Sequence, residues 1–165
     1  MKPELTVLMI LCAGAAPASS EPPQSVRIYQ VEELRWPQID AFDRERTMFV
    51  LPIGMLEQHG PHLPIGADTF GVTFEADGVA PRVARALPQW NVVMLPPIGY
   101  GQGGANQIGG QLVHPGTYAI RQATVRSLVA DIGSQVALNR FKWVFVLHGH
   151  GGRHTTSPSM RHTTS

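Results

Sequence analysis

Apolar residues fall along this chain in compact runs and in stretches of helical spacing, with polar and glycine-rich segments between them. Three apolar runs, at residues 48–53, 91–98 and 142–147, have the length of buried strands. Apolar positions recur three and four residues apart from Phe70 to Leu87 and from Val125 to Val136, which is the spacing of an amphipathic helix. The pattern therefore predicts strands that alternate with helices.

Proline residues refine this outline. Pro81 lies inside the first predicted helix and is expected to kink or divide it, because proline lacks the N–H that an α-helix needs. Pro96 and Pro97 interrupt the second predicted strand near its end. A short helix is expected to begin after Pro37.

Alternating strands and helices are typical of βαβ units, in which helices cover both faces of a sheet. We therefore expect an α/β fold with three α/β/α layers and a mostly parallel sheet. Polar clusters follow two of the predicted strands, one after Ile53 and the other after Leu147. Because open α/β sheets bind ligands beyond the carboxyl ends of their strands, these clusters mark the expected functional site.

The first residues have the pattern of an export signal. Lys2 precedes an apolar run from Leu5 to Ala16, and small residues flank Pro17 at Ala16 and Ala18. The run is shorter than the roughly 20 apolar residues that a permanent membrane span needs. We therefore expect a cleaved signal and no permanent membrane span.

This interpretation predicts a signal peptide at residues 1–18, a polar leader at 19–30 and a periplasmic or secreted location. Cys12 could instead indicate lipid attachment, but Leu11 stands where that processing needs a small side chain. Cleavage after Ala18 would remove the only cysteine, which suits an oxidising compartment.

Composition narrows the expected partners and metal ligands. A net charge of +1 with 15% charged residues leaves no broad basic surface, so nucleic acid is not an expected partner. Seven histidines stand against one cysteine. A single cysteine cannot form a thiolate cluster, so any metal is expected to be held by imidazole and carboxylate groups.

Groups of this kind gather at the two predicted strand ends. Glu57 and His59 are two residues apart, so in an extended backbone their side chains point to the same side. Asp68 opens the following helix, and His150 follows the third predicted strand. From the residues alone, Glu57 and His59 could also be solvated loop residues, and Asp68 could be only a helix N-cap.

The metal interpretation assigns three ligands to one strand end and one to another. Imidazole nitrogen and carboxylate oxygen bind Zn²⁺ and also accommodate Mn²⁺. In two-metal hydrolases a shared carboxylate holds two ions close together, and Asp68 is the candidate for that role. Two divalent ions, zinc or manganese, are therefore the expected cofactors.

The residues around these clusters resemble the creatininase, or creatinine amidohydrolase, family. The motifs that carry the resemblance are Leu51-Pro52-Ile53-Gly54, Glu57-Gln58-His59-Gly60-Pro61-His62-Leu63-Pro64, Asp68-Thr69, Leu95-Pro96-Pro97-Ile98-Gly99-Tyr100-Gly101, His114-Pro115-Gly116-Thr117 and Val146-Leu147-His148-Gly149-His150-Gly151-Gly152. They stand in the family's order. The resemblance implies a creatininase-like α/β domain over residues 31–152.

The same resemblance implies a function and a set of ligands. Metal ligands are expected at Glu57, His59, Asp68 and His150, with Asp68 shared between two ions. The implied activity is hydrolysis of a non-peptide or cyclic C–N amide bond in a small-molecule substrate, by a water that the metals activate. Catalytic residues other than the ligands are not assigned.

The chain departs from the family's pattern near its second cluster. His148 stands where family members commonly carry Asn, and Gly152 stands where creatininase proper has a glutamate ligand. Family members also continue further, whereas residues 153–165 have no apolar period and are expected to form a disordered or aberrant tail. We therefore expect a sheet that is incomplete at its C-terminal side, with edges that leave room for a homo-oligomer. A catalytically inactive, truncated metal-binding remnant is the alternative function.

Four further residues are expected to line the pocket or support the ligands: His62, His148, Tyr100 and Thr117. His62 could be a ligand, although the neighbouring Pro61 favours a packing or supporting role, and His148 could equally support a ligand or cap its strand. Residues 99–104 contain the Gly-x-Gly-x-x-Gly pattern of dinucleotide sites. Because no apolar helix follows, this segment is expected to form a wall of the substrate pocket instead.

Overall fold

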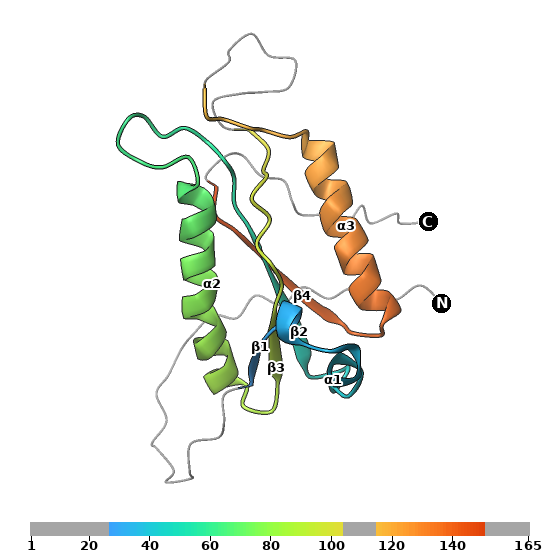
Figure 1. The fold of residues 1–165 in the computed structure, drawn as a ribbon. Helices are drawn as coiled ribbons and strands as arrows, with labels where there is room; N and C mark the ends of the chain where they lie inside the picture. The colour runs from blue at the N-terminus through green and yellow to red at the C-terminus, as the bar shows by residue number, and fades with distance from the viewer. Residues whose placement is uncertain (1–26, 104–114, 151–165) are drawn as a thin grey trace, which may run out of the picture.

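The computed structural model describes residues 27–103 and 115–150, and within them four strands form one sheet in the order β1-β3-β2-β4 (Figure 1). The strands are β1 (Ile28–Gln30), β2 (Thr47–Ile53), β3 (Asn91–Met94) and β4 (Trp143–His148). All three neighbouring pairs are parallel. The predicted parallel sheet is thus confirmed.

Helices cover both faces of this sheet. They are the 3₁₀-helix η1 (Val31–Glu33), α1 (Trp36–Asp40), α2 (Ala67–Ala86) and α3 (Gln122–Leu138). Figure 1 shows α2 on one side of the sheet and α3 on the other, with α1 near the lower end of α3. The expected α/β/α layering is therefore confirmed.

Two hydrophobic cores lie on opposite faces of the sheet because strand side chains alternate in direction. Val50 and Phe49 belong to different cores, as do Val92 and Val93. The core beneath α2 contains Val50, Ala76, Ala80, Ala84, Val92 and Met94. The other core contains Phe49, Val93 and Phe141, with partly buried side chains of α1 and α3 packed against it.

Helix α2 runs through Pro81 without interruption. Its buried residues Val72, Ala76, Ala80 and Ala84 are spaced by four, so small side chains pack against the sheet both before and after the proline. Proline removes one intrahelical hydrogen bond, and this packing keeps the turns on both sides of it helical. Of the two predicted outcomes, a divided helix is therefore wrong, and a kink at Pro81 stays a prediction.

Other element boundaries differ by a few residues from the sequence prediction. Strand β3 ends at Met94, before the two prolines, and Ile98 then makes a single parallel bridge to Ile53. The short helix begins at Trp36, so Pro37 lies in its first turn, where proline is tolerated. The sheet also begins before residue 31, because β1 pairs with β3 inside the segment predicted to be a leader.

Several predicted features lie outside the described residues. These are the signal peptide at 1–18, the first part of the leader and the tail at 153–165. Among the described helices, none combines the length and the apolar character that a bilayer span requires.

Candidate metal centre

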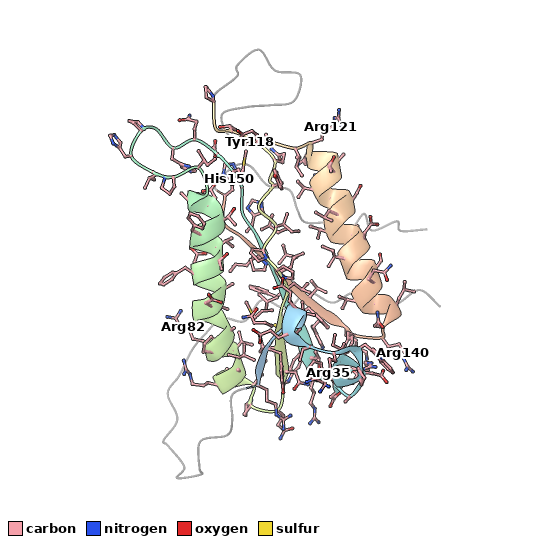
Figure 2. The ribbon with its side chains drawn as sticks, in the orientation of Figure 1. Arg35, Arg82, Tyr118, Arg121, Arg140 and His150 are labelled. Carbon is pink, nitrogen blue, oxygen red and sulfur yellow. The ribbon has the colours of Figure 1, made fainter. Side chains whose placement is uncertain are left out.

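The ends of β2 and β4 lie side by side, so the loops that follow them leave the sheet together. Ile53 pairs with His148 in the parallel register, and the N–H of Gly149 donates to the carbonyl oxygen of Ile53 at 2.9 Å. Figure 2 shows His150 at this end of the sheet, whereas Arg35 and Arg140 lie at the other end. The topology thus brings together two polar clusters that are about 90 residues apart in sequence.

Two glycines let the first turn of α2 approach these strand ends closely. A Cβ atom on Gly54 would lie 2.4 Å from the Cα atom of Thr69, and one on Gly149 would lie 2.5 Å from Cβ of Val72. The Gly149 Cβ would also lie 2.8 Å from the carbonyl oxygen of Asp68. Glycine is therefore needed at both positions for Asp68 to sit beside the two loops.

Hydrogen bonds fix the loop that carries Glu57 and His59. The N–H of Glu57 donates to the carbonyl oxygen of Ile65 at 2.8 Å. The hydroxyl of Thr69 donates to the carbonyl oxygen of Met55 at 3.2 Å, which ties the start of α2 to the start of the loop. The loop therefore folds back on itself and presents Glu57 and His59 toward Asp68 at the start of α2.

The carboxylate of Asp68 faces two histidines with its two oxygens. Oδ1 lies 3.2 Å from Nε2 of His59, and Oδ2 lies 3.0 Å from Nδ1 of His150. The same nitrogen of His150 lies 3.2 Å from Oε2 of Glu57. The four side chains thus form two overlapping sets of donors that share Asp68.

These groups are tightly grouped and mostly withdrawn from water. One ligand atom from each of Glu57, His59 and Asp68 lies within 4.8 Å of the others. The side chains of Glu57, Asp68 and His150 are only 11%, 13% and 9% exposed. Two carboxylates buried this close together are costly without a compensating cation.

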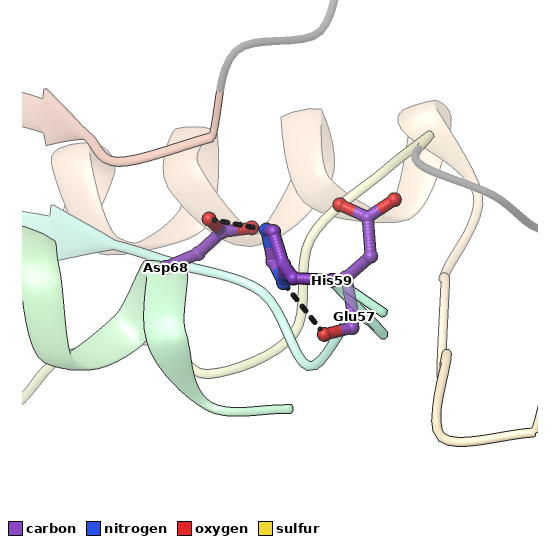
Figure 3. Close-up of side chains that lie close together, drawn as sticks. All are labelled: Glu57, His59 and Asp68. Atoms are coloured by element: carbon purple, nitrogen blue, oxygen red, sulfur yellow. Dashed lines mark hydrogen bonds and ion pairs between the residues drawn. The ribbon is translucent and has the colours of Figure 1, made fainter. Parts of the chain in front are cut away.

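The ring of His59 shows what kind of cation the cluster fits. Its Nδ1 lies 2.9 Å from the carbonyl oxygen of Glu57, which can only accept, so Nδ1 carries the proton (Figure 3). In the neutral ring, Nε2 then directs a lone pair at Oδ1 of Asp68. Two acceptors face each other favourably only with a proton or a metal ion between them. Backbone-bonded Nδ1–H with a free Nε2 is common in metal-binding histidines, so these residues fit a divalent ion.

The remaining predicted residues occupy different positions. His148 ends β4, and its Nδ1 lies 3.2 Å from the backbone nitrogen of His150 and 3.1 Å from its carbonyl oxygen. It therefore braces the turn that presents His150. Thr117 is buried and bonds to the backbone of Gln58. In contrast, His62 and Tyr100 are exposed, and within residues 27–103 and 115–150 no contact ties them to the ligand cluster.

The sequence did not reveal what supports the ligands. Asp68 lies in the first turn of α2, but Gly66 is its N-cap residue, so the N-cap role considered for Asp68 is not observed. The supporting contacts of Thr69 and Ile65 were also missed. The glycines at the two strand ends were the available signal, since each marks a close approach of backbone.

Comparison with known proteins relates this chain to one family of hydrolases. The family model described as "Creatininase: Creatinine amidohydrolase" matches residues 32–162. The chain is 37% identical over 107 residues to a mycofactocin precursor peptide peptidase of Mycobacterium ulcerans, which covers 62% of this chain and 40% of that protein. It is 29% identical over 121 residues to the creatinine amidohydrolase of Pseudomonas putida, which covers 73% of this chain and 44% of that protein. The chain therefore spans less than half the length of these relatives.

Solved structures agree with the sequence relatives. A mutant creatininase complexed with creatine superposes with a TM-score of 0.57 at 29% identity, covering 73% of this chain and 44% of that one. Similar creatininase structures include a manganese form and a Zn-Zn form. The similarity thus extends to proteins that are described with the metals expected for this donor set.

Proposed function

This chain belongs to the creatininase family, and from that premise we propose that it is a metal-dependent hydrolase of an amide C–N bond. The observation that carries the proposal is the carboxylate of Asp68, whose two oxygens face histidines from two different loops. A carboxylate in this position is suited to hold two cations at once.

The donors divide into two sets around Asp68. Glu57, Asp68 and His150 would hold one ion, because both carboxylates lie beside the same nitrogen of His150. His59 and Asp68 would contribute to a second. The first set reaches the three protein ligands usual at a catalytic zinc site. Zinc or manganese is the proposed metal, supported by the donor types and by the forms of the related structures.

Asp68, Glu57 and His59 each have a distinct part in this proposal. A bound divalent ion supplies Lewis-acid activation of water and of the scissile carbonyl. Asp68 fixes the relative position of the two sets of donors, and Glu57 adds a buried negative charge that favours cation binding. His59 is held with Nε2 toward Asp68 by its hydrogen bond to the backbone. With a side-chain exposure of 28%, His59 is the most open of the four and marks the side from which substrate would enter.

For the substrate we propose a non-peptide or cyclic amide, as the resemblance to creatininase implies. A second candidate is the amide bond of a peptide. It is favoured by the peptidase relatives, whose identities of 33% to 39% exceed the 29% of the creatinine amidohydrolase. Both kinds of substrate contain the same C–N bond, so the proposed role of the metals is common to them.

The test is metal content and turnover of the purified chain. We expect metal-free protein loaded with Zn²⁺ or Mn²⁺ to retain the ion through gel filtration and to hydrolyse creatinine, another cyclic amide or a short peptide. Asp68→Asn should lose both properties. Asp77→Asn, at an exposed position on the same helix, should keep them. Retention of metal and activity by Asp68→Asn would contradict the proposal.

A further inference from the structure

Residues 117 and 118, which precede α3, lie against the loop that carries Glu57 and His59, called the ligand loop below. They bond to it at two points. The hydroxyl oxygen of Thr117 accepts a hydrogen bond from the N–H of Gln58 at 3.1 Å. The N–H of Tyr118 donates to the carbonyl oxygen of Leu56 at 2.9 Å. These two bonds fall on either side of Glu57, so the segment is hydrogen-bonded to the backbone on both sides of a proposed ligand.

The bond from Gln58 to Thr117 acts on one particular peptide group. The N–H of Gln58 and the carbonyl of Glu57 belong to the same planar unit, so an acceptor that orients the N–H also orients the carbonyl. That carbonyl accepts the hydrogen bond from Nδ1 of His59 at 2.9 Å. A chain of contacts therefore runs from the Thr117 hydroxyl, through one peptide plane, to the imidazole of His59.

The ring orientation at the end of this chain decides which nitrogen meets Asp68. With the proton on Nδ1, Nε2 is the nitrogen that lies 3.2 Å from Oδ1 of Asp68. If the peptide plane rotated, the carbonyl would no longer select this tautomer, and the ring would lose its fixed direction. Hydrogen bonds in such a chain also strengthen one another by polarisation.

We propose that Thr117 is a positioning residue that sets the tautomer and orientation of His59 through the Glu57–Gln58 peptide group. The part of this inference that concerns metal affinity rests on the proposed function. The part that concerns the histidine ring does not, since it follows from contacts within the protein alone.

Burial makes Thr117 suitable for a conservative test. Its residue exposure is 7%, so Thr117→Val preserves the shape of a packed side chain while it removes the acceptor for Gln58. We expect Thr117→Val to bind Zn²⁺ roughly 10-fold to 100-fold more weakly in a chelator competition, the range typical of groups that orient metal ligands. Thr117→Ser keeps the hydroxyl and should restore the affinity.

Thr47 provides the matched control. It is a fully buried threonine whose hydroxyl donates to the carbonyl oxygen of Asp43 at 2.6 Å and accepts from Nδ2 of Asn91 at 3.1 Å. It begins β2, whose far end leads into the ligand loop, about 20 Å away at the usual rise of a strand. Thr47→Val should lower thermal stability and leave Zn²⁺ affinity unchanged. A loss of affinity in both variants would reduce Thr117 to a general structural residue and overturn the inference.

The second readout is the tautomer of His59 in metal-free protein, measured by ¹⁵N NMR of the imidazole ring. We expect the Nδ1–H form in the wild-type chain and in Thr117→Ser, and a mixture of tautomers in Thr117→Val. Thr117→Ala should behave like Thr117→Val, which keeps the test valid if valine does not fold. An unchanged tautomer in both acceptor-free variants would refute the role of Thr117. Failure of the wild-type chain to bind Zn²⁺ would instead contradict the proposed function, and the NMR result would still decide the role of Thr117.

Discussion

At the scale of single residues, the site depends on how one carboxylate is shared. Asp68 meets His59 with one oxygen and His150 with the other, while Glu57 lies 3.2 Å from His150 and has a ligand atom within 4.8 Å of those of His59 and Asp68. By their contacts of 3.2 Å or less, the two sets of donors are unequal, with three protein groups around Nδ1 of His150 and two around Nε2 of His59. Gly152, two residues after His150 in the sequence, has no side chain to add a further ligand.

This inequality predicts two steps in a Zn²⁺ titration. The first ion should bind through Glu57, Asp68 and His150, and the second should bind at least about tenfold more weakly, because it lacks the third protein ligand usual at such sites. Isothermal titration calorimetry on metal-free protein measures both steps. Two equal, tight steps would mean that another group, such as His148, completes the weaker set.

That the four candidate ligand residues lie together could be predicted from sequence, but the contacts that support them could not. Glu57, His59, Asp68 and His150 stand at strand ends in a recognisable order, so local pattern was sufficient to nominate them. The bond between Gln58 and Thr117 joins residues 59 positions apart, and nothing in the spacing of either motif indicates it. Ring orientation is likewise set by a backbone carbonyl, which every residue possesses.

At the scale of secondary-structure elements, the position of Asp68 depends on how closely α2 packs against the strand ends. A Cβ on Gly54 would lie 2.4 Å from the Cα atom of Thr69, so the first turn of α2 would have to move. We expect Gly54→Ala to lower the free energy of unfolding by about 1–3 kcal/mol, as overpacked cores do, and to weaken metal binding. Urea unfolding and metal content measure the two effects.

Gly78 is the control for this prediction because it lies in the same helix with nothing within 4 Å of its would-be Cβ. Gly78→Ala should raise stability by about 0.5–1 kcal/mol, since alanine is the better helix former, and should leave metal binding unchanged. If Gly54→Ala behaved in the same way as Gly78→Ala, the close packing of α2 would not be what positions Asp68.

Helix α2 also lacks one internal hydrogen bond at Pro81, and its packing against the sheet compensates for that loss. Pro81 removes one hydrogen bond, and the alanine face on either side of it keeps the helix continuous. Pro81→Ala should therefore raise the free energy of unfolding by about 2 kcal/mol in urea, relative to the exposed neighbour variant Arg82→Ala. A decrease in stability would show that the proline is adapted to a bend that α2 requires.

The elements themselves were largely predictable. Strands β2 and β4 are compact apolar runs, helices α2 and α3 carry apolar residues at helical spacing, and the structure places each within three residues of its expected bounds. Two outcomes needed tertiary information. Strand β1 has only three residues, too few for a period, and forms because β3 offers it an edge. The continuity of α2 depends on alanines that pack against the sheet, which proline rules alone do not capture.

At the scale of the whole molecule, the described part of the chain presents an open sheet and exposed apolar side chains. Strands β1 and β4 form its two edges, and Phe70 and Phe74 are 65% and 80% exposed one turn apart on α2. Surfaces of this kind favour association. The homo-oligomer expected from the sequence stays a prediction.

Export is the second prediction at this scale. Lys2, the apolar run from Leu5 to Ala16 and the small residues around Pro17 predict cleavage after Ala18 and a periplasmic or secreted protein. Mass spectrometry of the protein isolated from its host should find a mature N-terminus at Ser19. Recovery of an intact chain that begins at Met1 in the cytosol would contradict it.

The central claim is that Asp68 joins two metal sites, and anomalous diffraction from a crystal soaked in Zn²⁺ or Mn²⁺ tests it most directly. We expect one anomalous peak beside Glu57, Asp68 and His150 and a weaker one between His59 and Asp68, about 3.5–4 Å from the first, the usual separation in two-metal hydrolases. A matched crystal of Asp68→Asn should lose both peaks, because Asp68 belongs to both sets of donors. Strong peaks at the exposed His62, with none at Asp68, would contradict the account.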